Sequence, residues 1–174
     1  LTRMNGFDLL TLGQAEGPGC YCGLNELLKY GIETLAQKYT ITLIDCEAGI
    51  EQINRRVISS VDILITVSDA TVKGLRTAVY LKEIAEKYGL SKTYRNGLVI
   101  NRADDDMDDL IQKARAMDLD LLAVIPVDRN VAEYDKAGKP VIDLPADSLS
   151  IGAVRKIIDK LELNLFLKDP AISL

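Results

Sequence analysis

The chain alternates short apolar runs with longer segments in which apolar residues recur at helical spacing. Runs of this length, each bounded by polar or turn residues, predict strands that are buried on both faces, which is typical of a parallel sheet. The five runs are Leu9–Leu12, Ile41–Ile44, Ile63–Val67, Leu98–Ile100 and Leu121–Ile125. A weaker run, Val141 and Ile142, follows Pro140 and is a sixth candidate strand.

Four segments between or after these runs carry apolar residues at i, i+3, i+4 and i+7. This spacing predicts amphipathic helices whose apolar faces pack on the sheet. The stripes are Leu24, Leu27, Leu28 and Leu35; Leu81, Ile84, Ala85 and Tyr88, before the terminator Gly89; Met107, Leu110, Ile111, Ala114 and Met117; and Val154, Ile157, Ile158, Leu161 and Leu165. Strands and helices in alternation predict an α/β fold, a doubly wound and mainly parallel sheet with helices on both faces.

Length and composition fit one globular domain. The chain has 174 residues, of which 48% are hydrophobic and 27% charged, so we expect a single domain over residues 1–174. No apolar run approaches the roughly 20 residues that span a bilayer, and no signal peptide is visible. Three cysteines are too few for a disulfide framework. We therefore expect a cytoplasmic protein with no membrane span.

The charge balance excludes some partners and some chemistry. A net charge of -5 and a pI near 4.8 argue against a nucleic-acid surface. Much of the acidic excess lies in the aspartates between Asp104 and Asp109, which predict a solvated helix start. The sequence has no histidine, which excludes Ser-His-Asp and Cys-His catalysis and every His-ligated zinc site.

The stretch Gly17–Gly23, GPGCYCG, carries two cysteines one residue apart. A helix predicted from about Leu24 places Cys22 near a helix N-terminus, where free N–H groups and the helix dipole favour a thiolate. Cys20 and Cys22 supply half of a four-thiolate metal site, so a metal needs a second pair. The alternative is a glycine-rich turn with incidental cysteines. Cys46 is expected to be a buried, inert thiol.

Polar residues follow several predicted strands, and ligands of parallel sheets bind beyond the carboxyl ends of strands. The D-x-x-x-G segment from Asp45 to Gly49 has the pattern of a Walker B and switch II region. In such a region the carboxylate holds Mg²⁺ through water, and the glycine N–H can sense a γ-phosphate. The fourth strand is followed by Asn101 and Arg102, and the fifth by Pro126, Val127 and Asp128.

Together these segments resemble the MinD and nitrogenase-iron-protein (ParA-like) group of P-loop ATPases, and most of all the CooC-type accessory ATPases of carbon monoxide dehydrogenase. The segments that carry the resemblance are GPGCYC, LIDCEAGIEQINR, VSDATVKGLRTA, VINR and IPVD, between Phe7 and Asp128. The resemblance implies ATP or ADP with Mg²⁺ as the cofactor and a role in catalysis for Asp45 and Gly49. It also implies that Asn101, Arg102 and the segment Pro126, Val127, Asp128 lie at the adenine base.

The same resemblance implies partners. Two subunits of a homodimer would bring Cys20 and Cys22 together as a Zn²⁺ or Ni²⁺ site, and the client would be a metalloenzyme such as carbon monoxide dehydrogenase.

One departure from the family is large. The family opens with a phosphate-binding loop, G-K-G-G-x-G-K-[ST], and the 174 residues contain no such motif. The pair Gly138-Lys139 precedes Pro140 and follows no strong strand, so it lacks the context of that loop. We therefore expect a chain truncated at its N-terminus, lacking the first strand and the P-loop, and inactive as an ATPase by itself.

Three classes of function remain open. The first is an ATP-driven metallochaperone for nickel insertion into carbon monoxide dehydrogenase. The second is a related ATPase for the maturation of iron–sulfur or other metalloenzymes, and the third is a non-enzymatic metal-binding or dimerisation module. The amphipathic segment Val154–Phe166 lacks a basic excess, so we expect a docked terminal helix rather than a membrane-binding one.

Overall fold

The computed structural model describes residues 1–4, 6–11, 22–46, 58, 60–104 and 106–167, and the side chains in these ranges except at 22–25, 91–95 and 167. The chain forms two compact units. We call them the hairpin unit (Leu1–Ser59 with Asn164–Leu174) and the sheet unit (Ser60–Leu163). The single domain over residues 1–174 stays a prediction.

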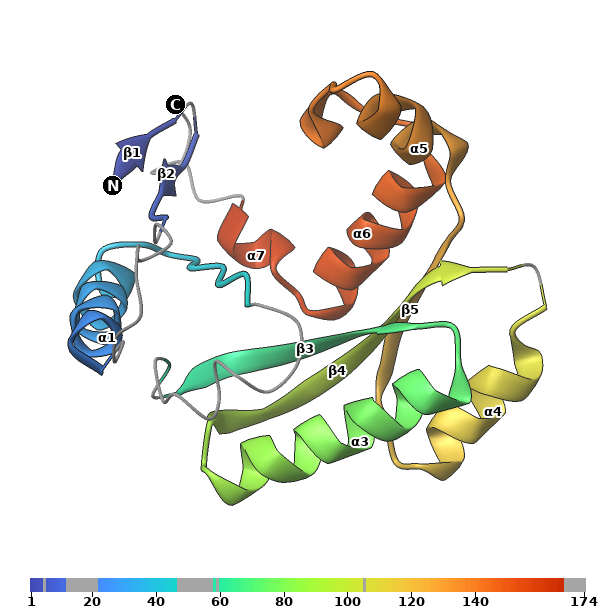
Figure 1. Cartoon of the computed structure of the whole chain (residues 1–174), viewed down its shortest axis with the longest axis horizontal. Helices are drawn as coiled ribbons and strands as arrows, with labels where there is room; N and C mark the ends of the chain where they lie inside the picture. Colours follow the sequence, from blue (N-terminus) through green and yellow to red (C-terminus); the bar gives the residue numbers. More distant parts are fainter. Residues whose placement is uncertain (5, 12–21, 47–57, 59, 105, 168–174) are drawn as a thin grey trace. The chain divides into compact units, whose positions relative to one another are not determined.

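Three parallel strands form the centre of the sheet unit: β3 (Val61–Asp69), β4 (Ser91–Ala103) and β5 (Leu121–Pro126), in the order β3-β4-β5. One face of this sheet is covered by α3 (Val72–Lys87) and α4 (Asp108–Ala116), and the other by α6 (Leu149–Lys160) (Figure 1). This arrangement confirms the predicted doubly wound α/β fold.

Alternate residues of β4 are buried on opposite faces of the sheet. Leu98 and Ile100 belong to the core cluster under α3 and α4, whereas Val99 packs with Leu122 and Leu161 on the side of α6. The other buried members of the first cluster are Leu75, Ala78, Ala103, Met107, Ala114 and Leu119. Burial of both faces explains why the run Leu98–Ile100 is continuously apolar in sequence.

Local signals fix the ends of α3. The Thr71 hydroxyl at the N-cap accepts a hydrogen bond from the Gly74 N–H at 3.0 Å, which satisfies one free donor of the first turn. Gly89 follows the last turn with φ +63°, a conformation that is costly for residues with a Cβ. The predicted stripe is confirmed at its centre, because Ile84 and Ala85 are buried.

The aspartates after β4 mark a helix start, as predicted. Asp108 and Asp109 form the first turn of α4 and are exposed, where carboxylates interact favourably with the helix dipole.

The predicted parallel strand at the start of the chain is wrong in the described residues. The run Leu9–Leu12 contributes only β2 (Asp8–Leu9), which pairs antiparallel with β1 (Thr2–Arg3), and residue 12 lies outside the description. The overlooked signal is the sequence Asn5-Gly6, a favoured hairpin turn. Gly6 has φ +88°, and the Met4 N–H donates to the Phe7 carbonyl at 2.9 Å.

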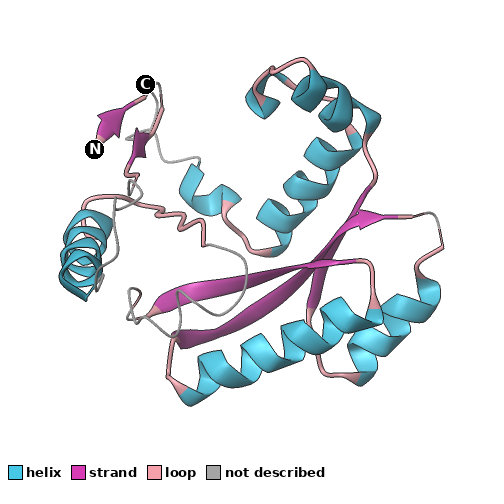
Figure 2. Cartoon of the chain, viewed as in Figure 1, coloured by secondary structure: helices cyan, strands magenta, loops and turns pink. Residues whose placement is uncertain are grey.

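The run Ile41–Ile44 forms no strand, which corrects a second prediction. Residues 41–46 follow α1 (Cys22–Ala36) as a loop (Figure 2). A strand needs neighbours for its N–H and C=O groups, and no strand of the described ranges pairs with this segment. As a consequence Leu43 is 88% exposed, and Cys46 is exposed rather than buried.

Two further predictions change in detail. Val141 and Ile142 belong to a 3₁₀ turn, η1 (Val141–Asp143), because Pro140 before them lacks an N–H and holds φ at -69°. The C-terminal stripe is divided: α6 ends at Lys160 and docks on the sheet, and α7 (Asn164–Leu167) follows in the hairpin unit. Within the described residues, no helix combines the length and the apolar character needed to cross a membrane.

Candidate functional site

The carboxyl ends of the parallel strands lie at one edge of the sheet unit. In the strand register Asp69 lies opposite Asn101, and Ala103 lies opposite Pro126. The Val127 N–H then donates to the Ala103 carbonyl at 3.1 Å, one residue past the end of β5. The strand-end residues singled out in β4 and β5 are therefore neighbours along this edge, whereas their roles stay predictions.

Asn101 and Arg102 form a fixed local arrangement. The Asn101 Oδ1 accepts a hydrogen bond from the Arg102 N–H at 3.0 Å, so the amide nitrogen of the carboxamide is directed away from this contact. Arg102 is exposed and has φ +54°, the left-handed conformation that non-glycine residues rarely adopt. The contact orients a side chain that carries one donor and one acceptor group.

Asp128 connects two helix N-termini. It is 8% exposed and is the N-cap of α5 (Arg129–Lys136), where its Oδ1 accepts from the Asn130 N–H at 2.9 Å. Its Oδ2 accepts from the Ser148 hydroxyl and from the Ser150 N–H, the latter at 2.9 Å. The Ser148 hydroxyl and then the Ser150 amide lower the pKa of Asp128 to about 2, so the carboxylate is ionised.

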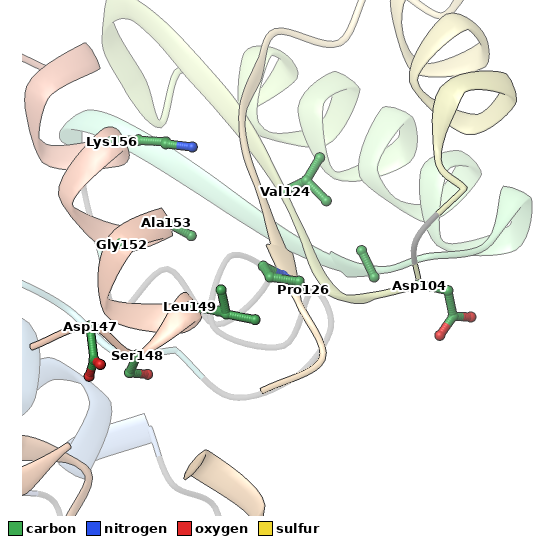
Figure 3. Close-up of a pocket in the computed structure, with 10 residues that line it drawn as sticks. Asp104, Val124, Pro126, Asp147, Ser148, Leu149, Gly152, Ala153 and Lys156 are labelled. Atoms are coloured by element: carbon green, nitrogen blue, oxygen red, sulfur yellow. The ribbon is translucent and has the colours of Figure 1, made fainter. Parts of the chain in front are cut away.

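A pocket of about 390 Å³ opens beside the ends of β4 and β5 and is closed on its other side by α6 (Figure 3). Its apolar lining consists of Ala103, Val124, Pro126, Leu149 and Ala153, with Gly152 between the last two. Its polar lining consists of Asp104, Asp147, Ser148 and Lys156. Figure 3 shows Leu149 and Lys156 extending from α6 toward the side of Val124 and Pro126.

Among the predicted site residues that the structure describes, one lines this pocket. Pro126 does so, whereas Asn101, Arg102, Val127 and Asp128 lie along the same strand ends outside its lining.

The α6 side of the pocket was missed by reasoning from sequence, because α6 follows β5 only after α5 and η1 and no motif marks it. The available signal was the pair of small residues Gly152 and Ala153 in its amphipathic pattern, which leaves space beside the sheet.

Such a pocket suits a flat, mainly apolar group with polar edges. Aliphatic side chains on two walls can pack on both faces of an aromatic ring, and a few polar groups at the rim can fix its orientation. Asp104 and Asp147 can accept hydrogen bonds from an amine, and Lys156 can pair with an anionic group.

The Gly-Lys pair of the sequence has a structural role. Gly138 has φ +62° directly after Ala137, the C-cap of α5, which is the usual place of a terminating glycine. The pair therefore follows a helix rather than a strand, which confirms that it is no phosphate-binding loop.

The site residues predicted in the hairpin unit are partly described. Asp45 is exposed, Cys22 is the first residue of α1, and Cys20 and Gly49 lie outside the described residues. Although Cys46 is exposed, partial shielding of its sulfur from water and then the adjacent Asp45 carboxylate raise the pKa of this thiol, which keeps it protonated. Within the described ranges, no three Cys, Asp or Glu side chains come together as a metal site.

Comparison with known proteins relates the chain to nucleotide-binding proteins, in agreement with its α/β fold. No family model matches the chain. It is 35% identical over 163 residues to an uncharacterized ATP-binding protein of Methanocaldococcus jannaschii, covering 92% of this chain and 64% of that protein. It is 32% identical over 142 residues to the carbon monoxide dehydrogenase accessory protein CooC of Rhodospirillum rubrum, covering 80% and 53%.

A solved structure shares the fold. MinD of Pyrococcus horikoshii OT3, complexed with Mg-ADP, matches with a TM-score of 0.66 and 25% identity, covering 84% of this chain and 60% of that one. The chain thus spans less than two thirds of the length of each of these three proteins. In sequence and in fold, the chain is related to the MinD/ParA-like P-loop ATPases, and CooC is among its relatives in sequence.

Proposed function

We propose that the sheet unit binds the adenine base of ADP or ATP in the pocket between β5 and α6, as part of an ATPase. The observation that carries this proposal is the position of the pocket: it lies beyond the carboxyl ends of parallel strands, where open α/β sheets bind ligands. The Mg-ADP complex of the related MinD from Pyrococcus horikoshii supports the class of ligand.

The lining suggests how the base is recognised. Pro126 from β5 and Leu149 from α6 would pack on opposite faces of the purine. The exocyclic amine of adenine would donate to Asp104 or Asp147 at the rim. Asn101, oriented by the Arg102 N–H, offers a carboxamide that can pair with a donor–acceptor edge of adenine.

Gly152 permits a sharp test of the pocket. Gly152 lines the pocket, and a Cβ at this position would meet no atom within 4 Å, so a larger side chain here would start in open space. In the full-length protein we expect Gly152→Leu to reduce ADP affinity at least about tenfold in calorimetric titration, because the side chain occupies the volume of the base.

The matched control is Gly31→Leu in α1, a second helical glycine whose Cβ would meet nothing within 4 Å. Both variants replace glycine by a good helix former, so neither should lose stability. Unchanged ADP affinity in Gly152→Leu would place the base elsewhere.

Hydrolysis would depend on the hairpin unit. We propose that Asp45 and Gly49 form the Mg²⁺ and γ-phosphate switch; the support is an exposed carboxylate, a ligand type that Mg²⁺ prefers. In the full-length protein Asp45→Asn should reduce ATP turnover far more than nucleotide affinity, because the carboxylate would act through Mg²⁺. Asn101→Ala should reduce affinity more than turnover. Equal losses of affinity in the two variants would contradict this division of roles.

The 174 residues contain no phosphate-binding loop, so this span by itself is expected to bind ATP weakly and not to hydrolyse it. ATP turnover by the span that Asp45→Asn abolishes would overturn that expectation.

We further propose that Cys20 and Cys22 of two subunits hold one Zn²⁺ or Ni²⁺ in a homodimer that serves nickel insertion into carbon monoxide dehydrogenase. Two observations support this: a similar protein is a carbon monoxide dehydrogenase accessory protein, and α1 begins at Cys22, where a helix N-terminus favours the thiolate. A four-thiolate site suits Zn²⁺ as a tetrahedral centre or Ni²⁺ as a square-planar one.

Metal analysis combined with native mass measurement tests the metal site. Cys20→Ser with Cys22→Ser should abolish stoichiometric metal and weaken the dimer, whereas Cys46→Ser should retain both. One metal per monomer, or metal retained in the double variant, would contradict the shared site. Normal nickel loading of carbon monoxide dehydrogenase by the double variant would favour another metalloenzyme client or a simple dimerisation role.

A further inference from the structure

We propose that Asp128 is a positioning residue for the pocket: its carboxylate holds the first turn of α6 against the end of β5 and does not itself contact the nucleotide. The proposal rests on the proposed nucleotide function of this pocket. It assigns the residue a different role from direct contact with the base.

The two carboxylate oxygens of Asp128 accept hydrogen bonds from two different helices. Oδ1 caps α5 through the Asn130 N–H at 2.9 Å. Oδ2 receives both contacts from the start of α6, namely the Ser148 hydroxyl and the Ser150 N–H at 2.9 Å. Ser148 is 2% exposed and Asp128 is 8% exposed, so water competes little with these hydrogen bonds.

These contacts bracket a wall of the pocket. Leu149, which extends toward the β5 side in Figure 3, lies between the two residues that bind Oδ2. On the other side, Pro126 lines the pocket and stands two residues before Asp128 in the chain. One carboxylate therefore fixes the distance between the two apolar side chains that would enclose the base.

The same contacts leave few hydrogen-bond acceptor positions of Asp128 for a ligand. A carboxylate offers about four acceptor positions, and three of them are used by donors from the protein itself. Asp128 is also absent from the pocket lining. The geometry thus favours an indirect role over recognition of the base.

Asp128→Asn separates the two functions of the side chain. Asparagine is a good N-cap, so its Oδ1 can keep the bond to the Asn130 N–H. The amide nitrogen that replaces Oδ2 cannot accept from the Ser150 N–H, which leaves this part-buried donor without its partner. We expect an approximately tenfold loss of ADP affinity in the full-length protein, with faster amide hydrogen exchange at the start of α6 and unchanged exchange in α5.

Two further variants complete the test. Ser148→Ala removes one contact to Oδ2 and leaves the Ser150 contact, so it should change exchange in α6 in the same direction but by less. Lys82→Met is the matched control, because it breaks a 2.7 Å ion pair between Lys82 and Asp118 in the same unit. It should leave ADP affinity and exchange in α6 unchanged, which separates the specific effect from general destabilisation.

The outcomes are distinct. Unchanged affinity together with unchanged exchange in Asp128→Asn overturns the positioning role, and so does a loss of affinity without faster exchange in α6, which indicates direct contact. Failure of the wild-type protein to bind ADP overturns the proposed function of the pocket. These failures can be told apart, because the exchange measurement on Asp128→Asn needs no nucleotide.

Discussion

The sheet unit and the hairpin unit contain apolar runs of the same kind, yet in the described part of the chain only the sheet unit buries such a run in a strand. Ile100 in β4 is fully buried between β3 and β5, whereas Leu43 in the run Ile41–Ile44 is 88% exposed in a loop. The difference shows that an apolar run favours burial but does not suffice to form a strand. The run becomes a buried strand only where a neighbouring strand pairs with its backbone N–H and C=O groups.

The helices of the two units repeat the contrast. α3 places Leu75, Ala78 and Ala85 against the sheet, each with at most 1% of its surface exposed. In α1, Leu27 from the predicted apolar stripe is 66% exposed and Tyr30 is 68% exposed. An amphipathic stripe therefore predicts a helix correctly in both units, and it predicts burial only in the unit that contains the three-stranded parallel sheet.

The largest expected difference between the units is in core truncation. Ile100→Ala should lower the free energy of unfolding by about 3 to 4 kcal/mol, because it leaves a cavity in a fully buried position. Leu43→Ala should change it by less than about 0.5 kcal/mol, as for other exposed positions. Denaturant unfolding of both variants measures the two values, and equal losses would show that the run around Leu43 is buried in solution.

Glycine substitutions sharpen the same contrast at a smaller scale. A Cβ on Gly97 in β4 would lie 2.1 Å from the Leu122 Cδ1, so Gly97→Ala should cost about 1 to 3 kcal/mol through overpacking. Gly31→Ala in α1 meets no atom within 4 Å and should instead stabilise by about 0.5 to 1 kcal/mol through helix propensity. Thermal unfolding distinguishes the signs, and two changes of the same sign would contradict the packing described for β4.

Acid should weaken the sheet unit through Asp128. Its pKa of about 2 in the folded chain lies below the ordinary value of 3.8, so the ionised form is favoured by folding. The resulting stability is complete above pH 3.8 and is lost as the pH falls toward about 2. The unfolding midpoint should therefore fall more between pH 5 and pH 2 in the wild type than in Asp128→Asn, and parallel curves would show that the carboxylate gains nothing from its contacts.

The smallest expected effect is kinetic and lies in the hairpin unit. The raised pKa of Cys46 should slow its alkylation by iodoacetamide at neutral pH several-fold relative to the unfolded chain, because only the thiolate reacts. A background of Cys20→Ser and Cys22→Ser isolates this thiol. Asp45→Asn should increase the rate, since the adjacent carboxylate contributes to the raised pKa. An equal rate in the folded and the unfolded chain would contradict the shielding of the sulfur.

Much of the sheet unit can be predicted from its sequence, because its determinants are local or periodic. The continuous apolar runs in β3, β4 and β5 predict parallel strands, and Gly89 predicts the end of α3. The expected burial on both faces is wrong at the end of the β3 run, because Val67 is 62% exposed. The position of the strand-end segments Asn101-Arg102 and Pro126-Val127 at one edge follows from parallel topology alone.

The candidate site itself depended on tertiary structure. Leu149 and Gly152 meet the end of β5 only because α6 folds back onto the sheet after α5 and η1, and no spacing in the sequence encodes that contact. In the same way, the sequence predicts that Asp128 follows a strand. Only the fold brings the Ser148 hydroxyl and the Ser150 N–H close enough to donate hydrogen bonds to its Oδ2.

The sequence by itself therefore determined the α/β class, the family resemblance, the helix ends and the line of strand-end residues, since each depends on neighbours along the chain or on a repeated period. The tertiary structure decided which apolar runs became strands, which wall closed the pocket and what the Asp128 carboxylate binds. The physical reason is that strand pairing and pocket closure join residues far apart in sequence, so their energy depends on partners that a local pattern does not specify.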